Sequence, residues 1–193
     1  CHLPGRDSGM NELAQRLGFT DLDAAFASGD QKAQALKKEC ARLLQAAQAS
    51  ANTAVSLSPA LPAAHRALAL TLWHRGQRQP AEVEARTLLN LNPSDAFGSY
   101  LLGLTSTDAE ESRGFHQRSL EIDPLLLENY LELAVWSYDA STAPGDEKEV
   151  EAAALLRKGL ALPASETARA PLRQLLGELL LRKGDARAAL QQA

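Results

Sequence analysis

The residue best suited to chemistry is Cys1, because its thiol and the α-amine belong to the same residue. An N-terminal cysteine can be a catalytic nucleophile when its own α-amine takes the thiol proton. Such a site needs a rigid pocket around the terminus, whereas the next residues, HLPGRDSG, are typical of a solvated tail. The other cysteine, Cys40, lies in the run KKECARLL, where we expect a buried free thiol. We therefore predict no catalytic residue and no enzyme activity.

The residue types that bind metals and phosphates do not form a recognisable site. The four histidines show no i, i+4 pairing and have no Cys or acidic partner at metal spacing. They are His2, His65, His74 and His116. The acidic run DEKEVE at residues 146–151 is typical of a solvated helix start. The sequence therefore predicts no metal and no cofactor.

The composition indicates an all-α protein. Apolar residues make up 45% of the 193 residues, which is enough to build a continuous core for one domain. They are mainly Ala and Leu, while the β-branched and aromatic residues that favour strands are scarce. The net charge of −4 comes without a basic stripe, which argues against a nucleic-acid partner. No stretch of the sequence approaches the roughly 20 apolar residues that span a bilayer.

Prolines recur along the chain at the spacing of a helical repeat. Pro59, Pro93 and Pro124 each follow an apolar helix end, and Pro163 follows a weaker one. Successive spacings are 34, 31 and 39 residues. Because proline lacks an N–H and its ring clashes with the preceding turn, these positions separate helices rather than interrupt them. The pattern predicts a series of helical repeats.

The clearest repeat, residues 62–95, resembles the tetratricopeptide repeat (TPR) family, whose units are two antiparallel helices, A and B. The matching residues are Leu68, Ala69, Leu72, Gly76, Ala81 and Pro93. The unit departs from the family in having His65 where Trp is favoured, and we expect His65 to be a packed side chain. It also has Ala85 with Leu88 where an aromatic residue with Ala is favoured, an exchange that can still fill the space. The resemblance implies a right-handed superhelical solenoid of antiparallel helix pairs.

We expect a flexible N-terminal tether at residues 1–10 and a single TPR-like helical domain at residues 11–193. The first layer, residues 11–59, is atypical and forms an N-terminal helical cap. It includes one long amphipathic helix, because residues 31–57 contain neither Gly nor Pro. The apolar stripe of that helix is Leu36, Cys40, Leu43, Ala47, Ala51 and Ala54. The repeats that follow are 62–95, 96–124, 127–163 and an incomplete 167–193.

The later repeats depart from the pattern in ways that predict local structure. Residues 96–124 are three residues short, which we assign to the turn, where Thr107 and Glu110 form a capping box. Residues 127–163 contain an inserted loop, DASTAPGDE. Pro171 is expected in the first turn of the last helix A.

In the TPR family, the A helices face a concave groove that holds a segment of another protein. Carried onto this chain, the groove residues are Arg66, Leu70, Trp73, His74, Tyr100, Leu104, Leu131, Val135 and Tyr138, with Gln174, Glu178 and Arg182 in the last repeat. Their apolar and aromatic character suits a helical or extended segment of a partner protein. Leu70 and Leu104 stand where cochaperones that hold acidic C-termini have basic residues or Asn, so that use is not expected.

With Cys1 first and a polar tether after it, the chain looks like a mature bacterial lipoprotein that carries lipid on this cysteine. The expected location is the periplasmic face of the outer membrane, with the lipid as its membrane contact. Similar proteins serve as pilotins and assembly factors of type IV pilus or secretion systems, which implies an adaptor function. The alternative is a peptide-binding TPR module excised from a larger cytoplasmic or receptor-linked protein.

Overall fold

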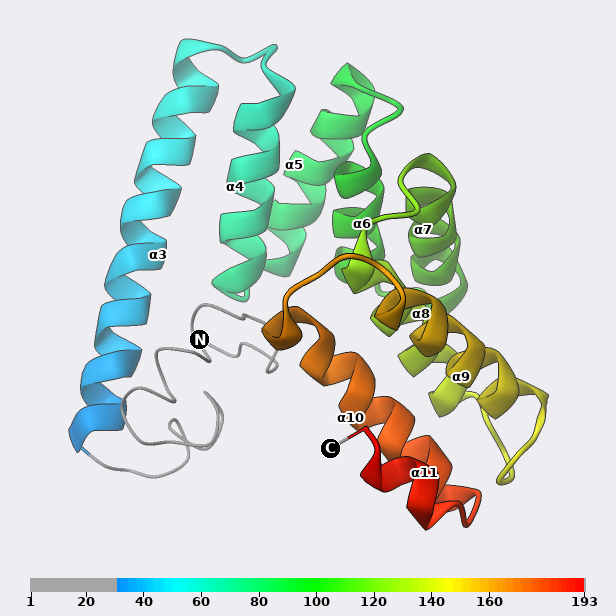
Figure 1. The fold of residues 1–193 in the computed structure, drawn as a ribbon. Coiled ribbons are helices and arrows are strands. Elements are labelled where there is room, and N and C mark those ends of the chain that lie inside the picture. The colour runs from blue at the N-terminus through cyan, green and yellow to red at the C-terminus, as the bar shows by residue number, and fades with distance from the viewer. Residues whose placement is uncertain (1–30, 193) are drawn as a thin grey trace. The chain divides into compact units, whose positions relative to one another are not determined.

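The computed structural model describes residues 31–192, and every regular element among them is an α-helix (Figure 1). Short connections join successive helices into antiparallel pairs, which confirms the all-α prediction for this range. Within the same range, no helix has the length and apolar character required to cross a membrane. The predicted tether at 1–10, the lipid site at Cys1 and the residues 11–30 of the first layer lie outside the described residues.

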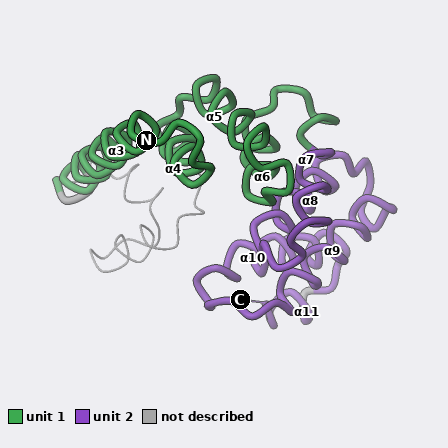
Figure 2. Tube along the Cα trace, turned by 90° about the horizontal axis from the view of Figure 1, so that it is seen from above, with its two compact units in different colours: residues 1–112 green, residues 113–193 purple. Residues whose placement is uncertain are grey.

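Two compact units make up the chain, residues 1–112 and residues 113–193 (Figure 2). The boundary falls inside helix α7, Ala109–Ile122. Each unit contains its own cluster of buried apolar side chains, so the helices are described unit by unit. The single domain over residues 11–193 stays a prediction, because residues 11–30 are not described.

The long helix predicted for the first layer is confirmed by α3, Gln31–Leu57. Its predicted stripe is correct at Leu36, Cys40 and Ala51, which are buried. The prediction is wrong at Leu43 and Ala47, which are exposed. A four-residue step overshoots one helical turn of 3.6 residues, so the buried line drifts around the helix axis. The drift carries this line away from those two positions.

The first repeat folds as α4, Pro62–His74, and α5, Arg78–Leu91. Gly76 has a φ of 73° in the turn between them, a left-handed conformation that glycine adopts without strain. The small residues predicted at the helix crossing, Ala69 and Ala81, are fully buried. Ala85 and Leu88 are also fully buried, so the exchange of large and small residues fills the core as expected.

The second repeat folds as α6, Ala96–Thr105, and α7. The three missing residues come from the helix and not from the turn, because α6 has 10 residues whereas α4 has 13. Arg78 on α5 supports this early end. Its Nε donates to the Thr105 carbonyl at 2.7 Å and its Nη2 donates to the Ser106 carbonyl. A cationic side chain on terminal carbonyls is favourable at a helix C-terminus.

The cap of α7 also differs from the prediction. Asp108, rather than Thr107, accepts a hydrogen bond from a first-turn amide, that of Glu111, at 2.8 Å. Ser106 Oγ donates to the Glu111 carboxylate at 2.6 Å, so the acidic residue beside the cap is Glu111 and not Glu110. The N-cap is therefore displaced by one residue, and the Asp108 amide donates to the Ser106 Oγ at 3.2 Å instead of completing a capping box with Glu111. Aspartate is a better N-cap acceptor than threonine, which agrees with the choice of Asp108.

In the second unit, α8, Leu127–Asp139, is followed by α9, Glu147–Leu160. The connection of residues 140–146 confirms the predicted insertion. The last pair is α10, Glu166–Arg182, and the short α11, Ala186–Leu190.

The prediction that Pro171 lies in the first turn of the last helix A is wrong, because Pro171 lies inside α10. The Ser165 hydroxyl accepts from the Ala168 amide at 3.2 Å and caps the helix earlier than expected. Pro171 therefore falls past the first turn, and its ring removes one hydrogen bond from the helix.

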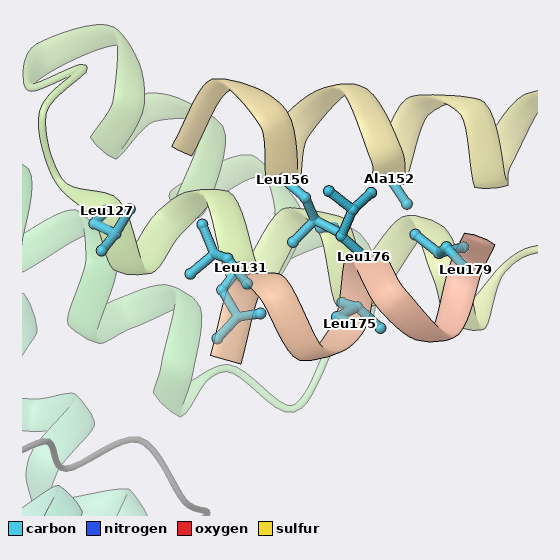
Figure 3. Packing of buried hydrophobic residues seen from close by; sticks show 9 residues of the cluster. Leu127, Leu131, Ala152, Leu156, Leu175, Leu176 and Leu179 are labelled. Carbon is cyan, nitrogen blue, oxygen red and sulfur yellow. The ribbon is translucent and has the colours of Figure 1, made fainter. Parts of the chain in front are cut away.

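The core of the second unit is aliphatic. Leu131 on α8, Leu156 on α9 and Leu176 on α10 point toward one another (Figure 3). Leu156 and Ala152 are fully buried, which places α9 against both neighbouring helices. Burial of each leucine of this kind stabilises the fold by about 1.5–3 kcal/mol.

Three joints between the second helix of one repeat and the first helix of the next are built from different pairs. In the first unit, Leu88 on α5 packs on Gly98 of α6. In the second unit, the Asn129 Nδ2 on α8 donates to the Ser119 Oγ on α7 at 2.7 Å. Also in that unit, Leu172 on α10 packs on Gly159 of α9. In the first joint the leucine lies on the second helix of a repeat and the glycine on the first helix of the next repeat, and in the third joint these positions are reversed. The second joint is polar.

Candidate protein-binding surface

The residues predicted to bind a partner lie on the A helices of the two units. Arg66, Leu70 and Trp73 are on α4 and Tyr100 and Leu104 on α6, two helices that contact each other in the first unit. The remaining three, Leu131, Val135 and Tyr138, are on α8, which contacts α10 in the second unit. Each group is described within its own unit.

Arg66 is exposed as predicted, but its charge is engaged within the first unit. Its guanidinium forms an ion pair with Asp95, whose side chain is 1% exposed. Asp95 caps α6 by accepting from the Gly98 amide at 2.8 Å. The guanidinium also lies 5.9 Å from the centre of the Phe97 ring, which itself contacts the Tyr100 ring. Arg66 therefore joins α4 to the start of α6 and leaves the surface around it close to neutral.

The apolar residues of the first unit divide between surface and core. Leu70, Trp73 and Leu104 are half-buried, and Trp73 packs against the cluster that contains Leu68 and Leu72. Tyr100 is only 8% exposed, so its ring is part of the interior rather than of an open surface. Tyr100 therefore does not have the exposure expected of it, while Leu70 and Leu104 retain partly open side chains.

The same division occurs in the second unit. Leu131 is buried because it shares one face of α8 with Leu127 and Ala134 and packs against α9 and α10. Its expected exposure is wrong for that reason. Val135 and Tyr138 are half-buried at the edge of this cluster. The partner-binding role of all eight residues stays a prediction.

A charged group from the last repeat covers Tyr138. The Arg182 guanidinium lies 5.0 Å from the centre of the Tyr138 ring, and Arg182 Nε is 3.0 Å from Glu149 Oε1. Glu149 is 3% exposed and also accepts from the Gly145 amide at 2.5 Å. The acidic run 146–151 is therefore not a simple solvated helix start. One of its carboxylates is buried and pairs with a predicted groove residue.

Asp146 organises the loop next to this pair. Its carboxylate accepts from the Glu149 amide at 2.9 Å, which caps α9, and from the Thr142 amide at 2.8 Å. Hydrogen bonds from these two amides stabilise the charged form and lower the pKa of Asp146 to about 2. Asp146 therefore stays ionised through the physiological range and holds the inserted loop against the start of α9.

A second aromatic group, which the sequence analysis does not identify, lies on the second unit. Trp136 has the Arg113 guanidinium 4.2 Å and the Lys148 ammonium 5.3 Å from its ring. Glu151 pairs with both cations, at 3.5 Å from Arg113 and 3.0 Å from Lys148. The hydrogen bond from Lys148 lowers the pKa of Glu151 against the opposing effect of burial. Trp136 falls outside the groove positions of the family, and its partners come from other helices, so sequence spacing does not predict this group.

The described residues contain no group of three or more Cys, His, Asp or Glu side chains that could hold a metal ion. Among the described residues, Cys40 is a buried thiol that takes part in no disulfide bond, as predicted. His65 is packed in the interior, as predicted, and His74 is the last residue of α4.

Solved structures share this arrangement of helices. TTC0263, a thermophilic TPR protein in Thermus thermophilus, is 21% identical over 81% of this chain and 83% of its own, with a TM-score of 0.63. MamA is 15% identical over 81% of this chain and 88% of its own, with a TM-score of 0.60. MamA 41-end from Desulfovibrio magneticus RS-1 is 20% identical over 82% of this chain and 88% of its own, with a TM-score of 0.58. No protein-family model matches the chain, and no curated protein matches it.

These likenesses show that the chain has the fold of TPR proteins, as its proline spacing and small crossing residues predict. Repeats of this kind stack so that each one contacts its neighbours along the chain.

Proposed function

We propose that this protein is a non-enzymatic interaction scaffold that binds a segment of another protein on its A helices. The observation that carries the proposal is the set of half-buried apolar side chains at predicted groove positions in both units, Leu70 and Leu104 in the first and Val135 and Tyr138 in the second. Partly exposed aliphatic and aromatic side chains are typical of surfaces that receive an apolar helix face or an extended segment. The ion pair of Arg66 with Asp95 leaves little net charge beside Leu70, which favours an apolar partner segment over an acidic tail.

Site-specific photo-crosslinking tests this surface. A benzophenone amino acid placed at Leu70 or Leu104 is expected to form a covalent adduct with one and the same partner in the native host. The same probe at Val83, which is 61% exposed on α5, and at Val150, which is 56% exposed on α9, is the matched control and is expected to form none. Adducts are detected by gel shift and identified by mass spectrometry.

Each probe variant is first shown to keep the far-UV circular dichroism spectrum of the natural protein, so that unfolding is excluded as the cause of a missing adduct. Equal crosslinking at Val83 and Leu70, or no adduct at either A-helix position, would contradict binding on the A helices.

The finer part of the proposal is an envelope function. A lipid-anchored protein on the periplasmic face of the outer membrane, with a binding surface for one partner, suits the assembly or stabilisation of a pilus or secretion machine. A pilotin is the specific candidate, and it depends on lipid at Cys1.

Intact mass spectrometry of the protein from its native host is the test of the anchor. We expect an added acyl mass on the peptide that contains Cys1. A longer polypeptide without lipid would instead support the excised cytoplasmic or receptor-linked module, and an unmodified chain without an extension would reject both. The anchor and the binding surface are tested separately, so failure of one leaves the other standing.

A further inference from the structure

The His65 side chain joins three parts of the first unit through its two ring nitrogens. His65 is 5% exposed on α4. Its Nδ1 lies 2.7 Å from Glu84 Oε2 on α5, and its Nε2 lies 2.8 Å from the carbonyl oxygen of Pro59 in the turn before α4. The family favours Trp at this position, which cannot make both contacts because an indole has one N–H.

The geometry of these contacts requires one of two proton arrangements. Either both ring nitrogens carry a proton, or Nε2 carries one and the Glu84 carboxyl group carries the other. A carbonyl can only accept, so Nε2 must carry a proton. In a neutral ring Nδ1 would then present its lone pair to the Glu84 carboxylate at 2.7 Å, which is repulsive. One further proton between His65 and Glu84 removes this repulsion. Because imidazole is more basic than a carboxylate, the proton resides on the ring and forms an imidazolium–carboxylate pair.

The contact with Pro59 fixes a turn whose apolar residues are exposed. Residues 58–61 connect α3 to α4 and contain no ionisable side chain. The charged group in contact with the ring is Glu84 on α5. Leu57 is 81% exposed and Leu61 46% exposed at the two ends of this turn. The Leu61 amide donates to the Ser58 carbonyl at 3.0 Å, and the Ala64 amide donates to the Leu61 carbonyl at 3.0 Å. These two amides report whether the turn is closed.

We propose that the proton shared by His65 and Glu84 is a pH-sensitive clamp that holds the turn at residues 58–61 against α5. With the proton present, the ring donates to both acceptors and holds the turn, with its exposed apolar side chains, in one position against α5. When the proton leaves as pH rises, the ring can no longer donate to both oxygens. The contact to the turn or the contact to α5 is then lost.

The direction of the titration agrees with this geometry. Burial acts to lower the pKa of His65, but the hydrogen bonds to the Pro59 carbonyl and to Glu84 outweigh it, so the pKa is raised above its ordinary value. A raised folded-state pKa contributes stability that is fully present below the unfolded value of about 6.5 and is lost as pH rises through the folded value. The clamp is therefore closed below the ordinary pKa of histidine and opens as pH rises through the raised folded value.

Nuclear magnetic resonance of the full chain tests the clamp with two substitutions on α5. Glu84→Gln keeps the shape of the side chain and gives Nδ1 a neutral N–H donor, so it satisfies a neutral ring at every pH. Glu82→Gln, on the same helix, changes a carboxylate that pairs with Arg86 and is the control. The measurements are the ring titration of His65 and the hydrogen-exchange protection of the Leu61 and Ala64 amides at about pH 6 and about pH 9.

In the natural protein we expect the His65 ring to titrate above its ordinary pKa and the two protection factors to fall at least about tenfold on the alkaline side. In Glu84→Gln the titration is expected to move below that of the natural protein, and the protection factors to become independent of pH. Glu82→Gln is expected to behave like the natural protein. A His65 pKa at or below its ordinary value, protection that does not change with pH, or equal effects of the two substitutions would each overturn the proposal.

Discussion

Replacing Asn129 by alanine is expected to destabilise the second unit by about 2–4 kcal/mol, because two buried polar groups lose a partner at once. Asn129 is fully buried at the joint of α7 and α8. Its Oδ1 faces the His116 Nδ1 at 2.9 Å, and its Nδ2 donates to the Ser119 Oγ at 2.7 Å. Alanine supplies neither an acceptor nor a donor, and its methyl group leaves a cavity. Urea denaturation of the full chain, followed by circular dichroism, measures the loss.

A variant that copies the apolar joint of the first unit into the second tests whether the joint depends on polar pairing or only on the filling of space. The first unit has Ala85, Leu88 and Gly98 at the positions that correspond, 31 residues later, to His116, Ser119 and Asn129. The triple variant His116→Ala, Ser119→Leu, Asn129→Gly therefore copies an apolar joint that this chain already builds. We expect it to be more stable than Asn129→Ala, because both partners of each of the two hydrogen bonds to Asn129 are removed together. A triple variant less stable than the single one would show that the two joints do not share one geometry.

Gly159→Ala is the second substitution with a large expected effect, a destabilisation of about 1–3 kcal/mol from overpacking. A Cβ at residue 159 would lie 2.5 Å from Leu172 Cδ2 and 3.0 Å from Tyr130 Cβ. The Tyr130 contact is the more rigid of the two, because a Cβ atom moves only with its helix. Gly159 therefore sets how closely α8 and α10 approach α9. Thermal or urea unfolding of the full chain measures the change.

Gly114→Ala is the matched control, since Gly114 lies in α7 with nothing within 4 Å of a built Cβ. Alanine favours a helix interior over glycine, so this variant is expected to be stabilised by up to about 1 kcal/mol. Combining Gly159→Ala with Leu172→Ala is expected to cost less than the sum of the two single substitutions, because the second removes the atom that the first overlaps. Additive losses, or equal behaviour of Gly159→Ala and Gly114→Ala, would contradict the close packing of this joint.

The sequence predicts most of the helices because their signals are local. Proline spacing marks the ends of the repeats, the absence of Gly and Pro over residues 31–57 predicts α3, and Gly76 marks a turn that needs a positive φ. Small residues such as Ala69 and Ala81 mark helix crossings, where both are fully buried. Each of these features depends on a backbone constraint or a residue volume that the chain carries with it.

The candidate surface is less predictable, because the exposure of a side chain depends on what other helices bring to it. The family pattern places Tyr100 and Leu131 at groove positions, yet both are buried. It also places Arg66 at a groove position but does not show that Asp95 at the next helix start pairs with it. Such contacts join residues far apart in the sequence, and a repeat pattern contains no information about them.

By itself, the sequence determined that the described chain is a set of helix pairs with the repeat length of TPR proteins, since periodicity and turn residues act within one repeat. Only the tertiary structure decided that Glu149 is buried beneath Arg182, that His65 bonds to both α5 and the turn at Pro59, and that successive joints are apolar or polar. The physical reason is that burial and ion pairing are settled by neighbours in space, where the free energy of a polar group depends on whether a partner reaches it.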